Sequence, residues 1–581
     1  MMPHVAIDSA DGVRWDLTRV FADGDAARRA LAELDAAAAA LEPPGDDVDE
    51  IRAVLDAHDQ VARVAEVLHD EWGYAALRMS ADMDDVEARD LATATVPVLE
   101  RVRAACRALE ARYGELSDEA LADARLAPYR HYLERRRQER AFRLDPLAEQ
   151  AFAARGDAAS TAWRRLYDDT MTAVSVPFDA GDGFEPHSLN DLRALLWHRD
   201  RDVRLRAVAA AREARTHVAA TAAACLDAVT SDRLVEDRLR GHDDPMDATL
   251  FTDQVTRADV ESLLTAIEGR ASIVRRWYER KAAALGIDEC TEADRMAPVG
   301  DQREVPWSEA VTIAHDVFSA LGDGPGALAH ELTASGLIDA EPRTGKTAGV
   351  YCAPLPQGFP SLIQLTYRGQ PGDAFTLAHE LGHSMHFELA KAAHPWLTVE
   401  RSSSMAVVEI PSTTSEIAAV EHAIAISAEA DRGPLLRGFV ESMFDLVFET
   451  AALCRFEQDA AALRAAGTSL TADRLAELWR ARIEPYFGPA AAPDAWIEWP
   501  HPYGARFYNY QYSFAFLCSF GLAALRRADR AGFGARYAEM LRAGGSLPPA
   551  GLLEICGLDL ADPGLWEMGL DEIERLCDEA W

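Results

Sequence analysis

Residues 376–383 read TLAHELGH, and this His-Glu-x-x-His pattern limits the fold and chemistry of the chain more than any other stretch. A Pro-Gly pair breaks the chain shortly before it, Asp373 is a suitable N-cap, and apolar residues follow at helical spacing, so we expect a helix. On that helix His379 and His383 lie one turn apart on one face, where two imidazoles can bind one Zn²⁺. Glu380 then faces water at the metal, an arrangement typical of zinc peptidases.

The third metal ligand must come from outside this motif. His386 shares the helix face, but at 1.5 Å per residue it lies about 10 Å along the axis from His379, so we expect it to pack or to support the site. The predicted helix over residues 405–426 carries Glu409 and Glu416, which are seven positions apart and therefore on one face. One of them can bind the metal while the other orients a ligand histidine through its free ring N–H. The pattern does not choose between them.

Residues 501–512 form a dense aromatic stretch that also contains a histidine and an arginine. One interpretation is core packing, with each buried hydroxyl satisfied by a neighbour. The other is that His501 and one or two tyrosine hydroxyls donate hydrogen bonds to the oxyanion that develops during peptide hydrolysis. The candidate tyrosines are Tyr503, Tyr508 and Tyr510.

The charge of the chain excludes several classes of partner. Its 581 residues carry a formal net charge of −37, which argues against binding to nucleic acid or to anionic membranes. Only three of the 59 basic residues are lysines, and such an acidic, lysine-poor surface is compatible with salt adaptation or with a GC-rich genome. We therefore expect no nucleic acid and no membrane among the partners.

Cysteine usage and the N-terminus indicate the compartment. The eight cysteines are scattered and form no Cys-x-x-Cys pair, so we expect reduced, buried thiols. The first 16 residues lack the basic and apolar regions of a secretory signal. The stretch nearest to a membrane span, residues 510–525, is rich in aromatic and polar residues and predicts a buried helix instead. These features predict a cytoplasmic protein.

Hydrophobic periodicity predicts a mostly α-helical chain. The first 170 residues are almost entirely helical in pattern, and helical patterns return from residue 189 onward. Alternation over residues 174–178, followed by glycines, predicts a hairpin and a seam near residue 186. We therefore expect an N-terminal helical lobe over residues 1–186 and a catalytic domain over residues 187–581.

A small β-sheet is expected beside the zinc helix. Residues 345–352 and 361–366 have strand-like patterns with turns between them. Because the second stretch shortly precedes the helix, we expect the strand around residues 361–367 to pair with an extended peptide by strand addition. Two further helical regions, residues 405–426 and 434–463, follow the zinc helix.

Taken together, these features resemble the thimet-oligopeptidase superfamily of zinc peptidases, most closely its bacterial oligoendopeptidase F branch. The resemblance covers nearly the whole chain, and its most specific part is Glu409-x-x-Ser412-x-x-x-Glu416 at this distance after the zinc helix. The other matching segments are Trp15-Asp16-Leu17, the region Gly345-Lys346…Gly349-x-Tyr351-Cys352, residues 376–386, the block that starts at His501, and Gly557-Leu558-Asp559-Leu560.

The resemblance implies the third zinc ligand and the fold. It implies that Glu409 binds zinc together with His379 and His383, and that Glu416 stands behind this ligand set. The implied fold is a two-lobed, mostly α-helical zincin with a small β-sheet beside the zinc helix and a deep substrate channel. Such a channel admits short unstructured peptides and excludes folded proteins.

The resemblance also implies a group of residues that face the substrate carbonyl. His501 and Tyr510 match the family best in this role, with Tyr503 next. This chain carries one residue more than the branch's usual spacing within residues 504–506, which leaves Tyr508 as an alternative.

The expected activity is zinc-dependent hydrolysis of internal peptide bonds in short peptides, with one Zn²⁺ per chain and Glu380 as general base for the attacking water. An alternative is a carboxypeptidase or peptidyl-dipeptidase of related fold, which needs basic or tyrosine side chains to hold the substrate's free carboxylate. Arg506 is a candidate for that role. A further alternative is a catalytically inactive peptide-binding scaffold. The oligomeric state, monomer or homodimer, stays open.

Overall fold

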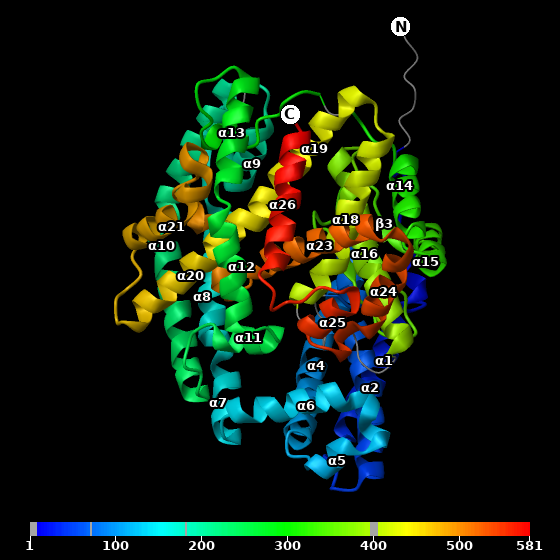
Figure 1. The fold of residues 1–581 in the computed structure, drawn as a ribbon. Coiled ribbons are helices and arrows are strands. Elements are labelled where there is room, and N and C mark those ends of the chain that lie inside the picture. Colours follow the sequence, from blue (N-terminus) through cyan, green and yellow to red (C-terminus); the bar gives the residue numbers. More distant parts are fainter. Residues whose placement is uncertain (1–8, 70–71, 180–182, 302, 395–404) are drawn as a thin grey trace. The chain divides into compact units, whose positions relative to one another are not determined.

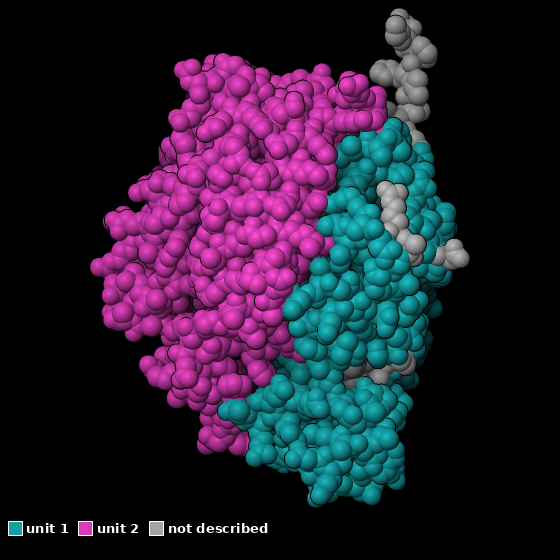
Figure 2. All heavy atoms as spheres, viewed as in Figure 1, with its two compact units in different colours: residues 1–141, 303–426, 522–560 teal, residues 142–302, 427–521, 561–581 magenta. Residues whose placement is uncertain are grey.

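The structure is a computed structural model that describes residues 9–69, 72–179, 183–301, 303–394 and 405–581. The chain divides into two compact units, each assembled from three separate stretches (Figure 2). Unit 1 comprises Met1–Ala141, Arg303–Ile426 and Leu522–Leu560, and unit 2 comprises Phe142–Gln302, Ser427–Gly521 and Ala561–Trp581. The expected boundary near residue 186 divides the chain by sequence rather than by compactness, and it stays a prediction.

Unit 1 is largely helical, and its early helices begin where the sequence offers aspartate caps. Its helices are α1 (Gly24–Ala39), α2 (Val48–Val67), α3 (Tyr74–Ala81), α4 (Val86–Tyr113), α5 (Asp118–Ala122), α6 (Arg130–Glu139), α14 (Trp307–Ser319), α15 (Asp323–Ala334), α16 (Pro371–Ala393), α18 (Met405–Ile426), α24 (Arg530–Ala543) and α25 (Pro549–Cys556) (Figure 1). Asp23, Asp47 and Asp85 accept hydrogen bonds from backbone N–H groups in the first turns of α1, α2 and α4. Apolar side chains of α2, α4 and α6, among them Leu55 and Leu109, form one buried cluster.

The sheet of unit 1 lies next to α16 in the chain and packs against it. Its strands among the described residues are β3 (Ile338–Asp339), β4 (Tyr351–Ala353) and β5 (Leu362–Gln364), in the order β3-β5-β4. β5 is parallel to β3 and antiparallel to β4, with Ile363 opposite Ile338 on one side and Cys352 on the other. The small sheet expected beside the predicted zinc helix is therefore present.

Two expectations for this sheet are corrected. The strand predicted over residues 345–352 keeps only its end, because Lys346 Nζ donates to Leu365 O at 2.6 Å and the Thr347 N–H donates to Ser80 O at 3.0 Å. These contacts hold Lys346 and Thr347 away from the strand pairing of the sheet. The strand expected to add a peptide is β5, but both of its edges are already paired, which leaves the two edge strands, β3 and β4. The chain on either side of β3 already bonds to Asp16 and Val13, so β4 is the better candidate.

The helix that carries the His-Glu-x-x-His motif is α16, and it begins before the expected cap. Pro371 is its first residue and Gln370 its N-cap, as suits a proline with a fixed φ and no N–H. Asp373 lies inside the first turn, where its carboxylate accepts from the backbone N–H groups of Arg368 and Gln370. The next helix, α18, has the predicted bounds and packs along α16.

Unit 2 is also mainly helical. Its helices are α7 (Pro146–Arg155), α8 (Ser160–Ala173), α9 (Leu189–Ala194), α10 (Arg201–Arg240), α11 (Asp247–Asp253), α12 (Arg257–Gly269), α13 (Ser272–Leu285), α19 (Glu429–Phe444), α20 (Thr450–Ala465), α21 (Ala472–Phe487), α22 (His501–Gly504) and α26 (Gly564–Glu579). β1 (Ser175–Asp179) and β2 (Phe184–Ser188) are antiparallel and confirm the predicted hairpin, whose tip lies outside the described residues. A π-helical turn, η7 (Asp445–Glu449), joins α19 to α20. The mostly α-helical fold is confirmed.

Two further expectations concern buried segments. Residues 510–525 belong to α23 (Tyr510–Ala528), a helix whose Phe514, Leu517 and Phe520 side chains are buried. All eight cysteines are buried and free, as expected for reduced thiols. None of the helices in the described ranges combines the length and apolar character that crossing a membrane requires.

Candidate metal centre

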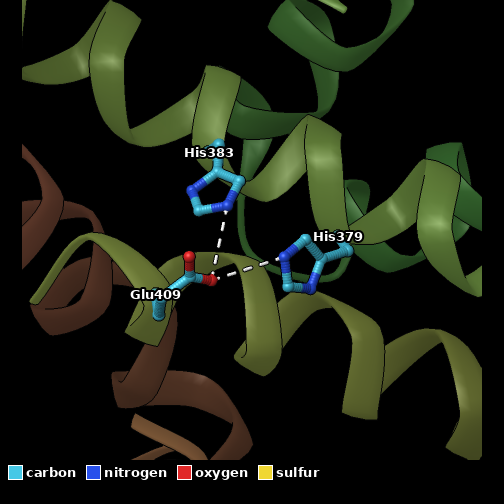
Figure 3. A group of neighbouring side chains, drawn as sticks. All are labelled: His379, His383 and Glu409. Atoms are coloured by element: carbon cyan, nitrogen blue, oxygen red, sulfur yellow. Dashed lines mark ion pairs between the residues drawn. The ribbon is translucent and has the colours of Figure 1, made fainter. Parts of the chain in front are cut away.

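α16 and α18 bring three potential metal ligands together (Figure 3). His379 and His383 project from successive turns of α16 toward Glu409 of α18. His379 Nε2 lies 3.4 Å and His383 Nε2 lies 3.5 Å from Glu409 Oε2. One ligand atom from each residue lies within 4.8 Å of the other two. The cluster contains both motif histidines and the first of the two candidate glutamates.

Gly382 sets the distance between the two helices. A Cβ at this position would lie 2.6 Å from Pro411 O, 2.7 Å from Ser412 Cα and 2.8 Å from Ser415 Oγ. Pro411 O and Ser412 Cα are backbone atoms of α18, so they cannot move aside as a flexible side chain would. A larger residue would therefore push α18 away from α16, and Glu409 away from the histidines.

Glu416 orients the first histidine. Glu416 Oε2 lies 3.0 Å from His379 Nδ1, and the other ring nitrogen, His379 Nε2, faces Glu409. A carboxylate that accepts the Nδ1–H of a ligand histidine fixes the ring and makes the other nitrogen a better donor to a metal. The structure thus places Glu409 within the cluster and Glu416 behind His379.

The protonation tendencies of the cluster follow from burial and from mutual charge. Burial by itself lowers the pKa of His379, but the carboxylates of Glu409 and Glu416 outweigh it and raise that pKa well above its ordinary value. Burial lowers the pKa of His383 to about 4, which favours the neutral imidazole. Burial opposes ionisation of Glu409, yet the two histidines and Ser412 bring its pKa down to about 2. A carboxylate and a neutral imidazole are the forms that bind metals, so Glu409 and His383 favour the binding form, whereas His379 must release a proton to bind one.

Glu380 is the buried acid of the motif. Its side chain is 5% exposed, and its Oε2 has no hydrogen-bond partner in the structure. Burial raises the pKa of Glu380 to about 7, against the opposing charge of His379. A buried carboxylate oxygen without a partner is costly and is expected mainly where a ligand or a reacting group supplies the partner.

His386 does not join the cluster. It is 2% exposed, its ring stacks with that of Phe387 at 5.9 Å between centroids, and burial lowers its pKa to about 3. It therefore packs as a neutral side chain, as the distance along the helix predicts.

The donor set fits zinc. Two imidazole nitrogens and one carboxylate oxygen are the protein ligands of a common class of catalytic zinc site, which keeps a fourth position open. The unpartnered Glu380 Oε2 lies on the same helix between the two histidines. No thiol belongs to the cluster among the described residues, so the set favours borderline metals such as zinc over soft ones.

The tyrosines predicted to face the substrate lie in unit 2, and two of them are buried. Tyr510 has no exposed surface, and its hydroxyl donates to Asp253 Oδ2 at 2.6 Å. Tyr503 is 1% exposed, and its ring stacks on that of Tyr167 with 3.7 Å between centroids. The hydroxyl of Tyr503 has no hydrogen-bond partner. Both tyrosines are therefore part of the packed interior of unit 2.

Tyr508 and Tyr512 have a different environment. Both are partly exposed, and their rings lie beside the imidazole of His501, with centroids 5.0 Å and 6.0 Å from its own. Burial lowers the pKa of His501, while the neighbouring side chain of Asn509 raises it. His501, Tyr508 and Tyr512 thus form a partly exposed aromatic group within the stretch.

An irregular backbone shapes this stretch. Phe507 has a φ of 53°, in the left-handed region that only a few non-glycine residues adopt. Glu457 holds it there, because its Oε1 accepts from the Phe507 N–H at 2.8 Å and its Oε2 accepts from Asn509 Nδ2 at 3.1 Å. A strained residue persists where its surroundings fix it, and here a buried carboxylate does so.

Two arginines hold the same stretch from the other side. Arg506 donates to both carboxylate oxygens of Asp237, each at 2.6 Å, and Arg233 donates to the carbonyl oxygen of Pro502 at 2.8 Å. Arg506 was a candidate for holding the free carboxylate of an exopeptidase substrate. Its bidentate pairing with Asp237 assigns it a structural partner instead.

Sequence reasoning missed the residues that hold the aromatic stretch, which are Glu457, Asp237, Asp253 and Arg233. Each lies on a helix far from residues 501–512 in sequence. A charged residue at an apolar helical position, such as buried Glu457, is the only signal that the sequence offers, and it does not name a partner.

Comparison with known proteins finds matches to peptidases along most of the chain. The profile of "Peptidase family M3" matches residues 194–572, and that of "Oligopeptidase F" matches residues 115–175. An oligoendopeptidase F homolog of Lactococcus lactis is 23% identical over 97% of this chain and 97% of its own length. A putative peptidase from Chlamydophila abortus (TM-score 0.81, covering 98% of this chain and 100% of its own) and oligoendopeptidase F from Enterococcus faecium (TM-score 0.69, 95% and 97%) share the fold at 20% identity. Because the first profile spans more than half of the sequence, the chain belongs to peptidase family M3.

Proposed function

We propose that this metallo-oligopeptidase is a zinc-dependent endopeptidase that hydrolyses internal bonds of short, unstructured peptides. The observation that carries the proposal is the convergence of His379 Nε2, His383 Nε2 and Glu409 Oε2 next to the buried acid Glu380. The printed names of the relatives, oligoendopeptidase F and its homologs, support the endopeptidase class. A cytoplasmic location and the choice between monomer and homodimer stay predictions.

His379, His383 and Glu409 would hold the zinc ion. When bound, zinc would supply a Lewis acid that polarises the scissile carbonyl and acidifies a water molecule. Glu416 keeps the His379 ring turned so that its Nε2 faces the metal position. Gly382 keeps α18 close enough for Glu409 to reach that position.

Glu380 is the proposed general base. A pKa raised to about 7 by burial lets its carboxylate accept a proton from the attacking water at neutral pH. The same group, once protonated, can give that proton to the amine that leaves. Its unpartnered Oε2 is free to make the hydrogen bond that this transfer requires.

His501, Tyr503 and Tyr510 are the proposed oxyanion donors from the family resemblance, and the contacts in unit 2 change their ranking. Tyr510 already donates its hydroxyl proton to Asp253, and the ring of Tyr503 is buried. The partly exposed Tyr508, whose ring stacks on His501, is the better candidate. We therefore propose His501 and Tyr508 as the donors to the developing oxyanion.

The substrate backbone is proposed to pair with β4. This strand is at the edge of the three-stranded sheet, and α16 packs against it. An edge strand offers backbone N–H and C=O groups that an extended peptide can pair with, which leaves side chains to determine specificity.

The test uses purified protein and a peptide blocked at both ends, because an exopeptidase cannot recognise such a substrate. We expect an internal cut, loss of the activity after chelation and its return with Zn²⁺. An uncut blocked peptide, alongside trimming of the same peptide with free ends, would establish the exopeptidase alternative. A protein that binds but never cuts either peptide would be the inactive scaffold.

A further inference from the structure

Lysine is rare in this chain, and all three lysines are buried. They are Lys281, Lys346 and Lys391, among 59 basic residues of which the rest are arginines. The Lys281 side chain has no exposed surface, and those of Lys346 and Lys391 are 1% and 8% exposed. An ammonium group is costly to bury unless acceptors surround it. The chain therefore keeps lysine at three interior positions, while arginine provides every other basic side chain.

The ammonium of Lys391 has one acceptor for each of its three N–H groups. Its Nζ donates to Leu355 O at 2.8 Å, to Phe359 O at 3.1 Å and to Glu388 Oε1 at 2.7 Å. A compact ammonium with three donors matches three converging acceptors, whereas the guanidinium of arginine is planar and directs five donors outward in a fork. Arginine is therefore a poor replacement at position 391.

Lys346 is surrounded in a similar way. Its Nζ donates to the carbonyl oxygens of Asp339, Glu341 and Leu365 at 3.0, 3.3 and 2.6 Å. It also lies 2.7 Å from Asp339 Oδ1, and Arg343 donates to the same buried carboxylate. Because Asp339 ends β3 and Leu365 directly follows β5, one ammonium connects the ends of two neighbouring strands.

The two ammonium groups bind the chain on either side of β4. Lys346 precedes the strand Tyr351–Ala353, whereas Leu355 and Phe359, the acceptors of Lys391, follow it. β5 is the only strand that pairs with β4 in the part of the chain that the structure describes. Two short paired strands are only marginally stable by themselves. The two lysines therefore supply support at both ends of a strand that has one neighbour.

Lys391 also connects β4 to the helix of the candidate metal centre. It lies on α16, about two turns after His383. Glu388, on the same helix, accepts from the N–H of Ser361 at 2.7 Å and from its hydroxyl at 2.6 Å, directly before β5. One helix thus presents the two histidines and fixes the chain between β4 and β5. All of these contacts are within unit 1.

We propose that Lys346 and Lys391 are positioning residues for substrate binding. They hold β4 so that its outer edge keeps one position relative to α16, where an extended peptide can pair with it. The proposal rests on the proposed function, in which the substrate backbone pairs with β4. Neither lysine belongs to the candidate metal cluster, so both act through the strand rather than on the reacting atoms.

The first experiment measures the strand itself and needs no substrate. Lys346→Arg and Lys391→Arg keep the positive charge and lose the fit to the acceptors. Hydrogen exchange of the backbone amides in residues 351–364, followed by mass spectrometry on the zinc-loaded proteins, is expected to be about tenfold faster in both variants than in the wild type. Zinc affinity in a chelator competition should stay unchanged. Wild-type exchange rates in both variants would overturn the proposal.

The second experiment separates substrate binding from the chemical step. With a peptide blocked at both ends, KM is expected to rise about tenfold in each variant while kcat stays within about twofold. The reason is that a displaced strand weakens the pairing but leaves Glu380 and the candidate metal ligands in place. In the Glu380→Gln background, the Kd of the same peptide should rise by the same factor. A fall in kcat at constant KM would contradict the positioning role.

Lys281→Arg is the matched control. Lys281 is also buried, and its Nζ donates to Arg295 O at 2.5 Å and to Glu441 Oε1 at 2.6 Å, both in unit 2. The same substitution there should lower stability, yet leave KM and the exchange of residues 351–364 unchanged. An equal rise in KM in Lys281→Arg would assign the effect to general destabilisation and would remove the positioning role.

A milder variant covers the case in which the lysine variants do not fold. Gln364 of β5 also holds the chain before β4, since its Nε2 donates to Gly349 O at 3.1 Å and to Thr347 Oγ1 at 2.7 Å. Thr347→Val keeps the shape of the side chain and removes the second of these acceptors. We expect KM to rise about threefold at unchanged kcat. An unchanged KM would show that substrate binding does not depend on how β4 is held.

The outcomes distinguish this proposal from the function on which it rests. If the wild type binds a blocked peptide but does not cut it, the endopeptidase function fails, and a weaker Kd in the two lysine variants still supports the positioning role. If the wild type cuts the peptide and both variants keep its KM despite faster exchange in β4, the endopeptidase function stands and the positioning role fails.

Discussion

In the candidate metal centre, three potential ligand atoms project from two regular helices, α16 and α18, that pack along each other. Residues 501–512 are built differently: a short helix is followed by the left-handed Phe507 before α23 begins. The ligands in the first region are neighbours on helix faces, whereas the second region is held by residues up to 269 positions away in sequence. A site on regular helices can be recognised from the spacing of its residues in the sequence. A site on an irregular segment depends on distant partners, which that spacing does not reveal.

The two regions also differ in how their polar groups are used. In the metal centre, Glu380 keeps an oxygen without a partner. In the aromatic stretch, the Tyr510 hydroxyl and the Arg506 guanidinium are already bound to aspartates. A group whose hydrogen bonds are complete holds the fold, while a group with an open position is available for chemistry. This difference separates Glu380 from Tyr510 and Arg506, and it can be tested residue by residue.

The largest effect is expected for Glu380→Gln, which keeps the size of the side chain and removes the base. We expect kcat to fall by about 10²–10⁴-fold, because the attacking water loses its proton acceptor. The zinc content, measured by elemental analysis, should stay at one per chain, because Glu380 is not in the ligand cluster. Undiminished cleavage by a protein that still carries zinc would remove Glu380 from the mechanism.

A smaller effect separates the tyrosines of the aromatic stretch. Tyr508→Phe removes the hydroxyl of a partly exposed tyrosine whose ring lies beside that of His501, and it should lower kcat by about 10²–10³-fold with little change in KM, as expected for an oxyanion donor. Tyr510→Phe is the matched control, because its hydroxyl is bound to Asp253. It should cost about 1 kcal/mol of stability and leave kcat within tenfold. The reverse pattern would restore Tyr510 to the role that the family resemblance implies.

The two regions show what could be predicted from the sequence. The sequence predicts the two helices of the candidate metal centre, together with the two histidines on the first and the two glutamates on the second. It does so because four- and seven-residue spacings place side chains on one helix face. The choice between Glu409 and Glu416 required either the family resemblance or the structure, since both share that face. The central place of β5 in its sheet could not be predicted, because it depends on the pairing with distant β3.

The residues that hold the aromatic stretch could not be predicted from the sequence, for a related reason. Tyr510 and Asp253 are 257 positions apart, and Phe507 and Glu457 are 50 apart on different elements. Burial of a tyrosine hydroxyl or of a glutamate is decided by the tertiary packing around it, which no local pattern records. The lower rank of Tyr503 and Tyr510 among the proposed donors therefore follows from long-range contacts with Tyr167 and Asp253.

Glu457, which holds the aromatic stretch, should make the stability of the protein depend on pH. Burial raises its pKa to about 7 in the folded protein, from an ordinary value of 4.5 that applies to the unfolded chain. Between these values the folded state keeps a proton that the unfolded state has lost, so the free energy of unfolding falls as the pH rises from about 4.5 to about 7, by about 3 kcal/mol. Glu457→Gln should flatten this part of the pH dependence in denaturant unfolding of the two proteins at pH 5 and pH 8. Parallel pH curves for the two proteins would contradict a raised pKa.

The smallest expected effect tests the regular packing of the metal centre. Gly382→Ala places a Cβ within 2.6–2.8 Å of Pro411 O, Ser412 Cα and Ser415 Oγ, so α18 must shift away from α16. We expect a loss of about 1–3 kcal/mol in stability from overpacking, together with weaker zinc binding in a competition titration with a chelator. Gly372→Ala, on the same helix but with nothing within 4 Å of its Cβ, is the control and should be neutral or slightly stabilising. If both variants bind zinc as tightly as the wild type, the ligand geometry tolerates a shift of α18, and the close helix approach serves packing rather than the metal.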